Sequence, residues 1–282
     1  MNIESIIFGQ GQMPQEMLRI VVAFIGLLAV SWYDLFNKRN VPNSVLYAFF
    51  AIAVIINLLF PGNLLEFSLI VTLFVGGISY IFYRTGQIGG ADAIVMTALT
   101  QLLPIHPSFA ALKFNFPFIL SIFLFSGIAF VIYFLVYFMY RVFKEKPEPK
   151  PLYLLILIPY LLFSYIYISS PLFFPFYFLI ISLSFLSIIF FYTYKESITR
   201  MLSEELPLKD VQEEEILALD LMDQKMVKKY NLQRLVTSNE LNKMKKLKIK
   251  SVFVYTKLPP FLPFMLLGLI LSLLFAHYLI LS

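Results

Sequence analysis

The sequence of 282 residues contains no cysteine and only two histidines, His106 and His277. The missing cysteine excludes disulfide bonds, thiolate catalysis and cysteine-bound zinc. Neither histidine has a second histidine or an acidic residue near it in the sequence, so we expect no metal or catalytic site at either. The prediction is a protein that uses no metal ion and no other cofactor.

Charged residues are scarce as well. Asp, Glu, Lys and Arg make up 14% of the chain, whereas soluble domains have about 25%. Apolar residues make up 60%, 31 residues are phenylalanine, and the mean hydropathy is +0.81. This composition predicts a membrane protein. No small-residue cleavage pattern follows the first apolar run, so we interpret that run as a retained helix rather than a signal peptide.

Eight apolar runs are candidates for membrane-spanning helices, each of which needs roughly 20 mostly apolar residues. The fourth run is shorter and carries Thr97, Thr100 and Gln101, so we expect an inner helix shielded from lipid by its neighbours. The predicted fold class is an all-α polytopic membrane protein, a bundle of about eight transmembrane helices with a small cytoplasmic α+β domain inserted before the last helix. The candidate spans are 17–36, 44–60, 64–83, 91–103, 116–140, 152–168, 172–194 and 258–281.

The sizeable polar segment lies between the seventh and eighth runs. We therefore divide the chain into a transmembrane helical core at 1–194, a soluble domain at 195–257 and a C-terminal transmembrane helix at 258–282. In the soluble domain, Thr237 and Glu240 have the spacing of a capping box, and KIKSVFVYT has strand character. We interpret its acidic run, SEELPLKDVQEEE, as a solvated helix start, with recruitment of a basic substrate as the alternative.

Positive charge gives the chain an orientation, because Lys and Arg in short loops mark the cytoplasmic side. With eight spans and the N-terminus outside, 20 of the 22 Lys and Arg fall on one side, and only Arg19 and Lys113 fall elsewhere. Asp34 then ends a helix that runs inward, and Asp92 begins a helix that runs outward. Both aspartates are therefore expected at the cytoplasmic end of the bundle, at similar depth.

Each aspartate also has a simple structural explanation. Asp92 could cap the helix that it begins, since a carboxylate accepts hydrogen bonds from the free N–H groups there. Asp34 could pair with Lys38 one helical turn later. However, ionisable groups inside membrane spans are costly and usually functional, and these two are nearly the only ones in the first five runs.

Two carboxyl groups at one depth suggest a catalytic dyad. At a separation of a few ångströms they cannot both ionise easily, so the pair keeps one proton. The charged member can then take a proton from water while the neutral one polarises an amide carbonyl. The small residues Gly89, Gly90 and Ala91 would let a partner helix or an extended substrate approach. This chemistry is aspartyl proteolysis.

The motifs around the two aspartates resemble those of the type IV prepilin peptidases, the GxGD-type membrane aspartyl proteases, and among them the archaeal prepilin and preflagellin (archaellin) peptidases. The resemblance rests on DLFNKRNVPN at 34–43 and GGAD at 89–92, with KLPPFLPFMLLGLI at 257–270 as a further element. It implies that Asp34 and Asp92 are the catalytic pair. Gly89, Gly90, Ala91, Pro42 and Asn43 would support the motifs or bind substrate.

The same resemblance implies the substrates. They would be prepilin- or archaellin-like proteins with basic leader peptides, cut at the cytoplasmic face of the cell membrane. The chain departs from the family pattern at Ala91, where glycine is usual, and in a loop before Pro42 that is one residue longer. Bacterial relatives also carry a cysteine-ligated zinc domain and methylate the new N-terminus, an activity not expected for a chain without cysteine. Membrane lipid is the other expected partner, and nucleic acid is not expected.

Two other functional classes fit parts of the sequence. A presenilin-like intramembrane protease would also use the YD pair at Tyr33–Asp34 and a GxGD-like motif. The VPN sequence after Asp34 and the 58-residue separation of the aspartates favour the prepilin peptidases. A transporter that moves protons or cations is the other alternative, although transporters often show internal repeats and no convincing repeat is found.

The orientation can be tested directly because the chain has no native cysteine. Single cysteines at Asn37, Gln87 and Ser238 are expected to resist membrane-impermeant maleimides in intact cells and to react after lysis. Labelling of all three positions in intact cells would invert the predicted topology.

Overall fold

The computed structural model describes residues 13–37, 40–110, 116–213, 215–247, 249–256 and 259–275. These described residues are 74% helical, and they contain one small two-stranded sheet. It divides into two compact units, one formed by residues 1–130 with 259–282 and the other by residues 131–258. Lys38, Lys113 and His277, which were considered above, lie outside the described residues.

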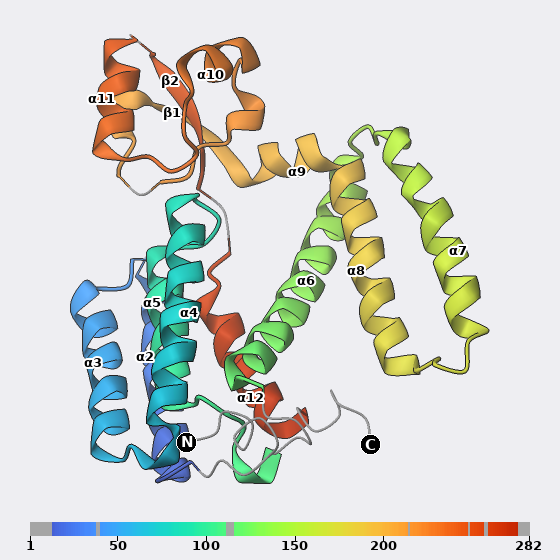
Figure 1. The fold of residues 1–282 in the computed structure, drawn as a ribbon. Coiled ribbons are helices and arrows are strands. Elements are labelled where there is room, and N and C mark those ends of the chain that lie inside the picture. The colour runs from blue at the N-terminus through green and yellow to red at the C-terminus, as the bar shows by residue number, and fades with distance from the viewer. Residues whose placement is uncertain are drawn as a thin grey trace. The chain divides into compact units, whose positions relative to one another are not determined.

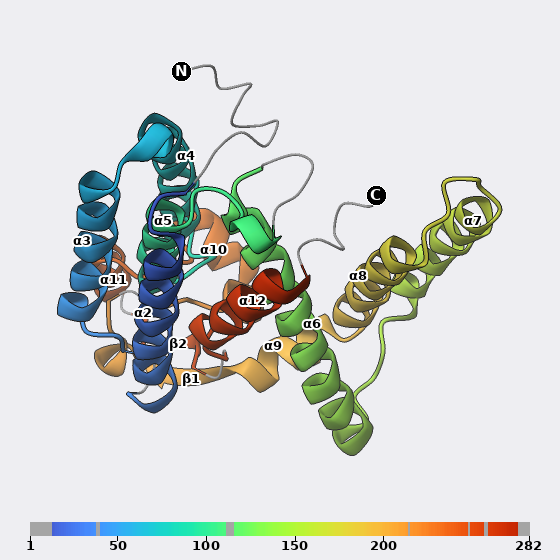
Figure 2. The ribbon, with the colours of Figure 1, turned by 90° about the horizontal axis from the view of Figure 1, so that it is seen from below.

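Each of the eight apolar runs contains a helix (Figures 1 and 2). In the first seven runs the helix ends lie within about five residues of those predicted, and the predicted ends of the last run, 258 and 281, lie outside the described residues. The sixth run begins with a 3₁₀ segment, η4 (Pro151–Ile156), that continues into α7. The helices are α2 (Glu16–Phe36), α3 (Asn43–Leu59), α4 (Leu65–Arg84), α5 (Gly90–Leu102), α6 (Phe118–Glu145), α7 (Leu157–Ile168), α8 (Pro175–Thr193) and α12 (Leu262–Phe275).

Five helices in the described residues are long and apolar enough to cross a membrane: α2, α4, α6, α8 and the continuous η4–α7 segment. The helices α3 and α12 are apolar but shorter, with 17 and 14 described residues. Helix α5 has 13 residues, which at 1.5 Å per residue is about 20 Å, short of a hydrocarbon core of about 30 Å. These findings fit a membrane protein, but the predicted number of eight spans is not confirmed.

The short helix α5 is the inner helix of the first unit. It packs against α2, α3 and α4, and none of its residues is exposed. Glycine permits close approach to α4, because a Cβ at Gly76 would lie 3.3 Å from Cγ2 of Thr97. By contrast, the outer faces of α2, α3 and α4 expose large apolar side chains such as Leu73, which is 76% exposed. An apolar exposed face of this kind suits contact with lipid.

Helix α12 completes this unit from the far end of the chain. It packs along α2, and Figure 2 shows the two helices side by side. Gly268 allows a close crossing with the start of α6, since a Cβ there would lie 2.5 Å from the carbonyl oxygen of Ile122. Its residues Leu262, Met265 and Leu269 are buried in the same apolar core as α2 and α5.

A buried arginine ties three helix ends together in the first unit. Arg19, near the start of α2, is only 1% exposed. Its guanidinium donates to the carbonyl oxygen of Phe60 just after α3 (2.8 Å), and to those of Gln101 (3.4 Å) and Leu102 (3.2 Å) at the end of α5. The last carbonyl groups of a helix have no partner within the helix and carry its negative dipole. The positive charge of Arg19 is therefore stabilised by backbone groups.

Polar side chains complete the surroundings of Arg19. Its two terminal nitrogens also donate to Oδ1 of Asn57, at 3.3 and 3.4 Å. Nδ2 of Asn57 in turn donates to Oγ of Ser68 and to Oε1 of Gln101, both at 2.6 Å. The cluster thus joins α2, α3, α4 and α5, and its members satisfy one another's hydrogen bonds where water is excluded.

The second unit contains the remainder of α6, then η4, α7 and α8, and a small polar region built around an antiparallel sheet. Strand β1 pairs with β2 from Ser203 opposite Tyr255 to Pro207 opposite Ser251. The small sheet of the predicted α+β domain is thereby confirmed. The elements of this region are α9 (Lys195–Leu202), β1 (Ser203–Pro207), η5 (Leu208–Asp210), η6 (Leu219–Leu221), α10 (Gln224–Tyr230), α11 (Ser238–Lys246) and β2 (Ser251–Tyr255).

Two sequence interpretations in this region have different outcomes. Thr237 does cap α11, because its hydroxyl accepts the N–H of Glu240 at 3.3 Å. The acidic run was wrongly interpreted as a helix start, since its first five residues form β1. The physical reason is long-range pairing: β2 supplies the backbone partners, and Oγ of Ser251 donates to Glu205 across the strands. Such pairing leaves no local signal in the sequence.

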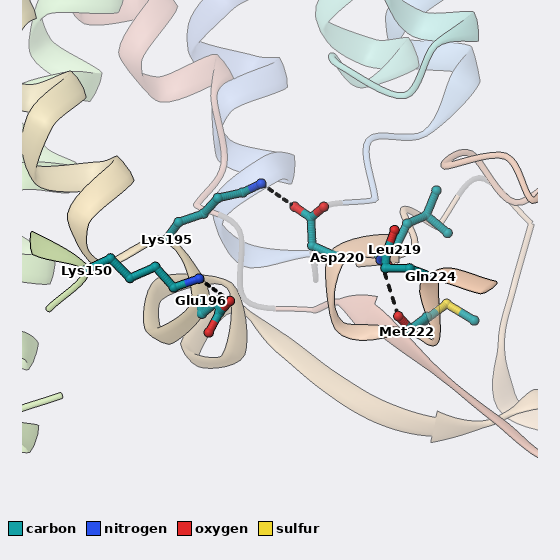
Figure 3. A network of polar contacts seen from close by, with 7 residues as sticks. All are labelled: Lys150, Lys195, Glu196, Leu219, Asp220, Met222 and Gln224. Atoms are coloured by element: carbon teal, nitrogen blue, oxygen red, sulfur yellow. Dashed lines mark hydrogen bonds and ion pairs between the residues drawn. The ribbon is translucent and has the colours of Figure 1, made fainter. Parts of the chain in front are cut away.

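Helix α9 joins the polar region to α6 and α8. Its apolar side chains Ile198, Met201 and Leu202 pack around Phe138 of α6, which is fully buried. On the outside, Lys195 pairs with Asp220 at 2.9 Å, and Glu196 pairs with Lys150 (Figure 3). The hydrogen bond to Asp220 raises the pKa of Lys195. Exposed ion pairs contribute at most about 1 kcal/mol, so the apolar cluster holds this junction.

The buried arginine predicts a large loss of stability on its removal. Arg19→Gln loses the charge-assisted bonds to Phe60, Gln101 and Leu102 and leaves buried carbonyl groups without donors, at a cost of about 1–3 kcal/mol for each group. We expect the Tm of the detergent-solubilised protein to fall by roughly 5 °C or more. Arg84→Gln, at an exposed position at the end of α4, is the matched control and should leave Tm nearly unchanged. Equal Tm values for the two variants would contradict the structural role of Arg19.

Candidate active site

Asp34 lies in the last turn of α2 and is 8% exposed. Its Oδ2 accepts a hydrogen bond of 3.3 Å from the backbone N–H of Leu262, the first residue of α12. These two residues are 228 positions apart in the chain. The end of one helix is thus joined to the start of another through a carboxylate.

Asp92 is the third residue of α5 and is partly exposed. Its Oδ2 accepts the backbone N–H of Gly89 at 3.1 Å, which closes the first turn of the helix. The capping role considered for Asp92 is therefore present in the structure. A capping carboxylate is held in a defined orientation at the positive end of the helix dipole. A catalytic carboxylate also needs a defined orientation.

The packing of α2 against α5 places these two aspartates at the same end of the helix pair. The helices are antiparallel, because the start of α2 contacts the end of α5 through Arg19, and Asp34 and Asp92 lie at the opposite ends.

The small residues before Asp92 lie in tight surroundings. A Cβ on Gly89 would lie 3.0 Å from Oδ2 of Asp92, and one on Gly90 would lie 3.3 Å from the ring of Tyr83. Ala91 packs against the apolar core of the first unit. Gly89 has φ −72° and ψ 153°, a conformation open to any residue. The need for glycine here therefore comes from the nearness of the carboxylate and not from backbone strain.

Pro42 and Asn43 are found at the start of α3. The carbonyl oxygen of Pro42 accepts the N–H groups of Val45 (2.9 Å) and Leu46 (3.2 Å), and Asn43 is the first residue of the helix and is exposed. Both residues have the contacts of a helix start. The structure does not join them to the aspartates through any described contact.

His106 is buried among apolar residues. It lies between the rings of Phe116 and Phe118, at 4.8 Å from each centroid, and its Nε2 is 2.8 Å from Oγ of Ser121. Burial lowers the pKa of His106 to about 4, so the ring is neutral at physiological pH. Within the described part of the chain, no three His, Asp or Glu side chains gather as metal ligands would.

Sequence reasoning missed the Leu262 N–H group beside Asp34. The proline-rich stretch before α12 had been noted for its resemblance to the family, without a role. A backbone donor has no residue type of its own, so only the position of the helix start could have indicated it. That position follows from the prolines, because proline favours the first turn of a helix.

Comparison with protein families gives a match that includes both aspartates. Residues 21–136 match the type IV leader peptidase family. The resemblance predicted from the two aspartate motifs is confirmed. All seven predicted site residues lie within the matched stretch. The match supports the activity of a leader peptidase-type protease. Comparisons with curated proteins and with solved structures give no match.

The close contact at Gly89 predicts a specific effect on activity. Gly89→Ala places a methyl group 3.0 Å from the nearer oxygen of Asp92, so the carboxylate must move by a few tenths of an ångström. We expect kcat for a leader peptide to fall by about tenfold or more, since small displacements of a catalytic group are costly.

Gly77→Ala is the matched control, because a Cβ at Gly77 meets no atom within 4 Å. Its activity and Tm should stay near those of the wild type. Equal activity of the two alanine variants would show that the position of Asp92 tolerates the added methyl group.

Proposed function

We propose that this protein is a membrane aspartyl endopeptidase that removes leader peptides from prepilin- or archaellin-like proteins at the cytoplasmic face of the membrane. The observation that carries the proposal is the antiparallel packing of α2 and α5, which sets Asp34 and Asp92 at one end of the two helices, inside the stretch that matches the type IV leader peptidases. The two acids come from helices that are far apart in sequence and meet at one end of the bundle.

The mechanism follows from a shared proton. A pair of close carboxyl groups holds one proton, because both cannot easily be charged. The ionised group removes a proton from a water molecule, and the oxygen of that water attacks the scissile carbonyl carbon. The protonated group donates its hydrogen to the carbonyl oxygen. When the tetrahedral intermediate collapses, a proton passes to the amide nitrogen and the C–N bond breaks. The mature protein is released with a new N-terminal amine, and the leader is left with a C-terminal carboxyl group.

The location of the pair supports a cut at the membrane surface. Asp34 lies at the end of α2 and Asp92 at the start of α5, so the dyad lies near helix ends and not at mid-depth. The excess of Lys and Arg in the short loops supports a cytoplasmic location for these ends. A leader peptide with basic residues stays on that side of the membrane, where the dyad can reach its junction with the apolar segment.

Conservative substitutions test the dyad. Asp34→Asn and Asp92→Asn are each expected to reduce cleavage of a prepilin-like substrate in membranes by about 10³-fold or more, because each removes the base or its proton-holding partner. The double variant should be little worse than either single one, since the two acids act as one unit.

The controls separate chemistry from folding and from metal dependence. Each variant should remain in the membrane in wild-type amounts, and a chelator such as EDTA should leave wild-type cleavage unchanged. Substantial cleavage by either single variant, or loss of cleavage with EDTA, would end the proposal. Ion uptake in place of cleavage would instead favour a transporter.

A further inference from the structure

The first turn of α12 directs one backbone donor at Asp34. This turn lies wholly within the described residues. Pro263 has no N–H, and the N–H groups of Phe264 and Met265 both donate to the carbonyl oxygen of Phe261, at 2.9 and 3.1 Å. The N–H of Leu262 donates instead to Oδ2 of Asp34. Proline thus removes a competing donor from the turn, and the remaining bonds leave Leu262 facing the carboxylate.

We propose that the backbone N–H of Leu262 is a positioning group that holds the Asp34 carboxylate in its catalytic orientation. This inference rests on the proposed function of Asp34 as one member of the dyad. A carboxyl group can rotate about the bond to its side chain, and a donor to one oxygen fixes the direction of the other. Catalytic groups need to be held within about 0.5 Å of their productive positions.

The donor itself is held firmly by aromatic packing. The ring of Phe261 contacts those of Phe123 and Phe130 of α6, with centroids 6.3 and 5.5 Å apart. The ring of Phe264 lies edge-on to Phe130 at 5.2 Å. Aromatic pairs in this geometry contribute about 0.5–1.5 kcal/mol each beyond their burial. The start of α12 is therefore packed against α6 by aromatic contacts.

The packing of α12 along α2 fixes the donor in the other directions. Leu262 is 1% exposed and Gly268, two turns later, brings α12 close to the backbone of α6. Helix α2 and helix α12 share the apolar core of the first unit. Movement of α12 along its axis would disrupt these contacts, so they favour a fixed position of the Leu262 N–H relative to Asp34.

A purely structural reading is that Asp34 only stabilises the start of α12. The two readings differ in the kinetic effect of removing the donor. If the bond only stabilises the helix, its loss lowers the stability of the protein, and the molecules that remain folded keep the wild-type kcat. If the bond orients Asp34, the folded enzyme has a lower kcat at unchanged KM, because substrate binding does not depend on this oxygen.

The test compares Leu262→Pro with Leu262→Ala. Proline lacks the N–H but suits the first position of a helix, where its fixed φ is favourable. Alanine keeps the N–H and, like proline, lacks the leucyl side chain, so the comparison isolates the donor. We expect kcat of the proline variant to be about tenfold or more below that of the alanine variant, with similar KM. Both constants are measured on folded protein that has been isolated by size-exclusion chromatography.

A second variant tests the same donor if the proline variant does not fold. Incorporating the α-hydroxy analogue of leucine at position 262 replaces the N–H by an ester oxygen and keeps the side chain. The same loss of kcat is expected. Equal kcat for the ester and wild-type proteins, or for the proline and alanine variants, would overturn the positioning role. Wild-type cleavage that requires Asp34 and Asp92 would in that case still support the proposed function, whereas failure of the wild type to cleave would reject the function itself.

Discussion

The buried guanidinium of Arg19 is the constraint on which the geometry of the first unit depends. It binds the carbonyl ends of α3 and α5 from the start of α2. Because α2 and α5 also carry Asp34 and Asp92, this contact fixes the register of the two helices whose opposite ends carry the proposed dyad. A slip of one turn would move one carboxyl group by about 5.4 Å along the helix axis relative to the other. A cluster at the far end of these helices therefore sets the relative positions of the two acids.

Both ends of this bundle are organised by helix termini. At one end the guanidinium of Arg19 donates to carbonyl groups at the ends of α3 and α5, where the helix dipoles are negative. At the other end the carboxylates of Asp34 and Asp92 accept N–H groups at the starts of α12 and α5, where the dipoles are positive. Each charge is thus placed where the backbone favours it. This arrangement explains how a charge-poor apolar core retains three ionisable residues without exposed counterions around each of them.

The sequence predicted the helices, and it singled out the two aspartates, because both depend on local or regular signals. Long apolar runs predict helices without knowledge of their tertiary contacts. The glycine-rich stretch before Asp92 indicates a helix start where side chains would be too close to the carboxylate. The role of Arg19 was not predicted, since the residue counted only as a charge on the outer side. Its partners are backbone carbonyls, which carry no residue identity. The donor at Leu262 and the strand β1 were missed for the same reason: each is defined by a segment about 50 or more residues away, Leu262 by Asp34 and β1 by β2.

The distance between Asp34 and Leu262 along the chain has a consequence for assembly. Residues 131–258 form a separate unit between the first part of α6 and α12. The contacts of Arg19 with the ends of α3 and α5 lie within the first 102 residues, whereas the contact of Asp34 with Leu262 spans 228 positions. Contacts this far apart close late because the segment between them must be ordered first. The hydrogen bond from Leu262 therefore ties the proposed orientation of Asp34 to completion of the first unit by the last helix.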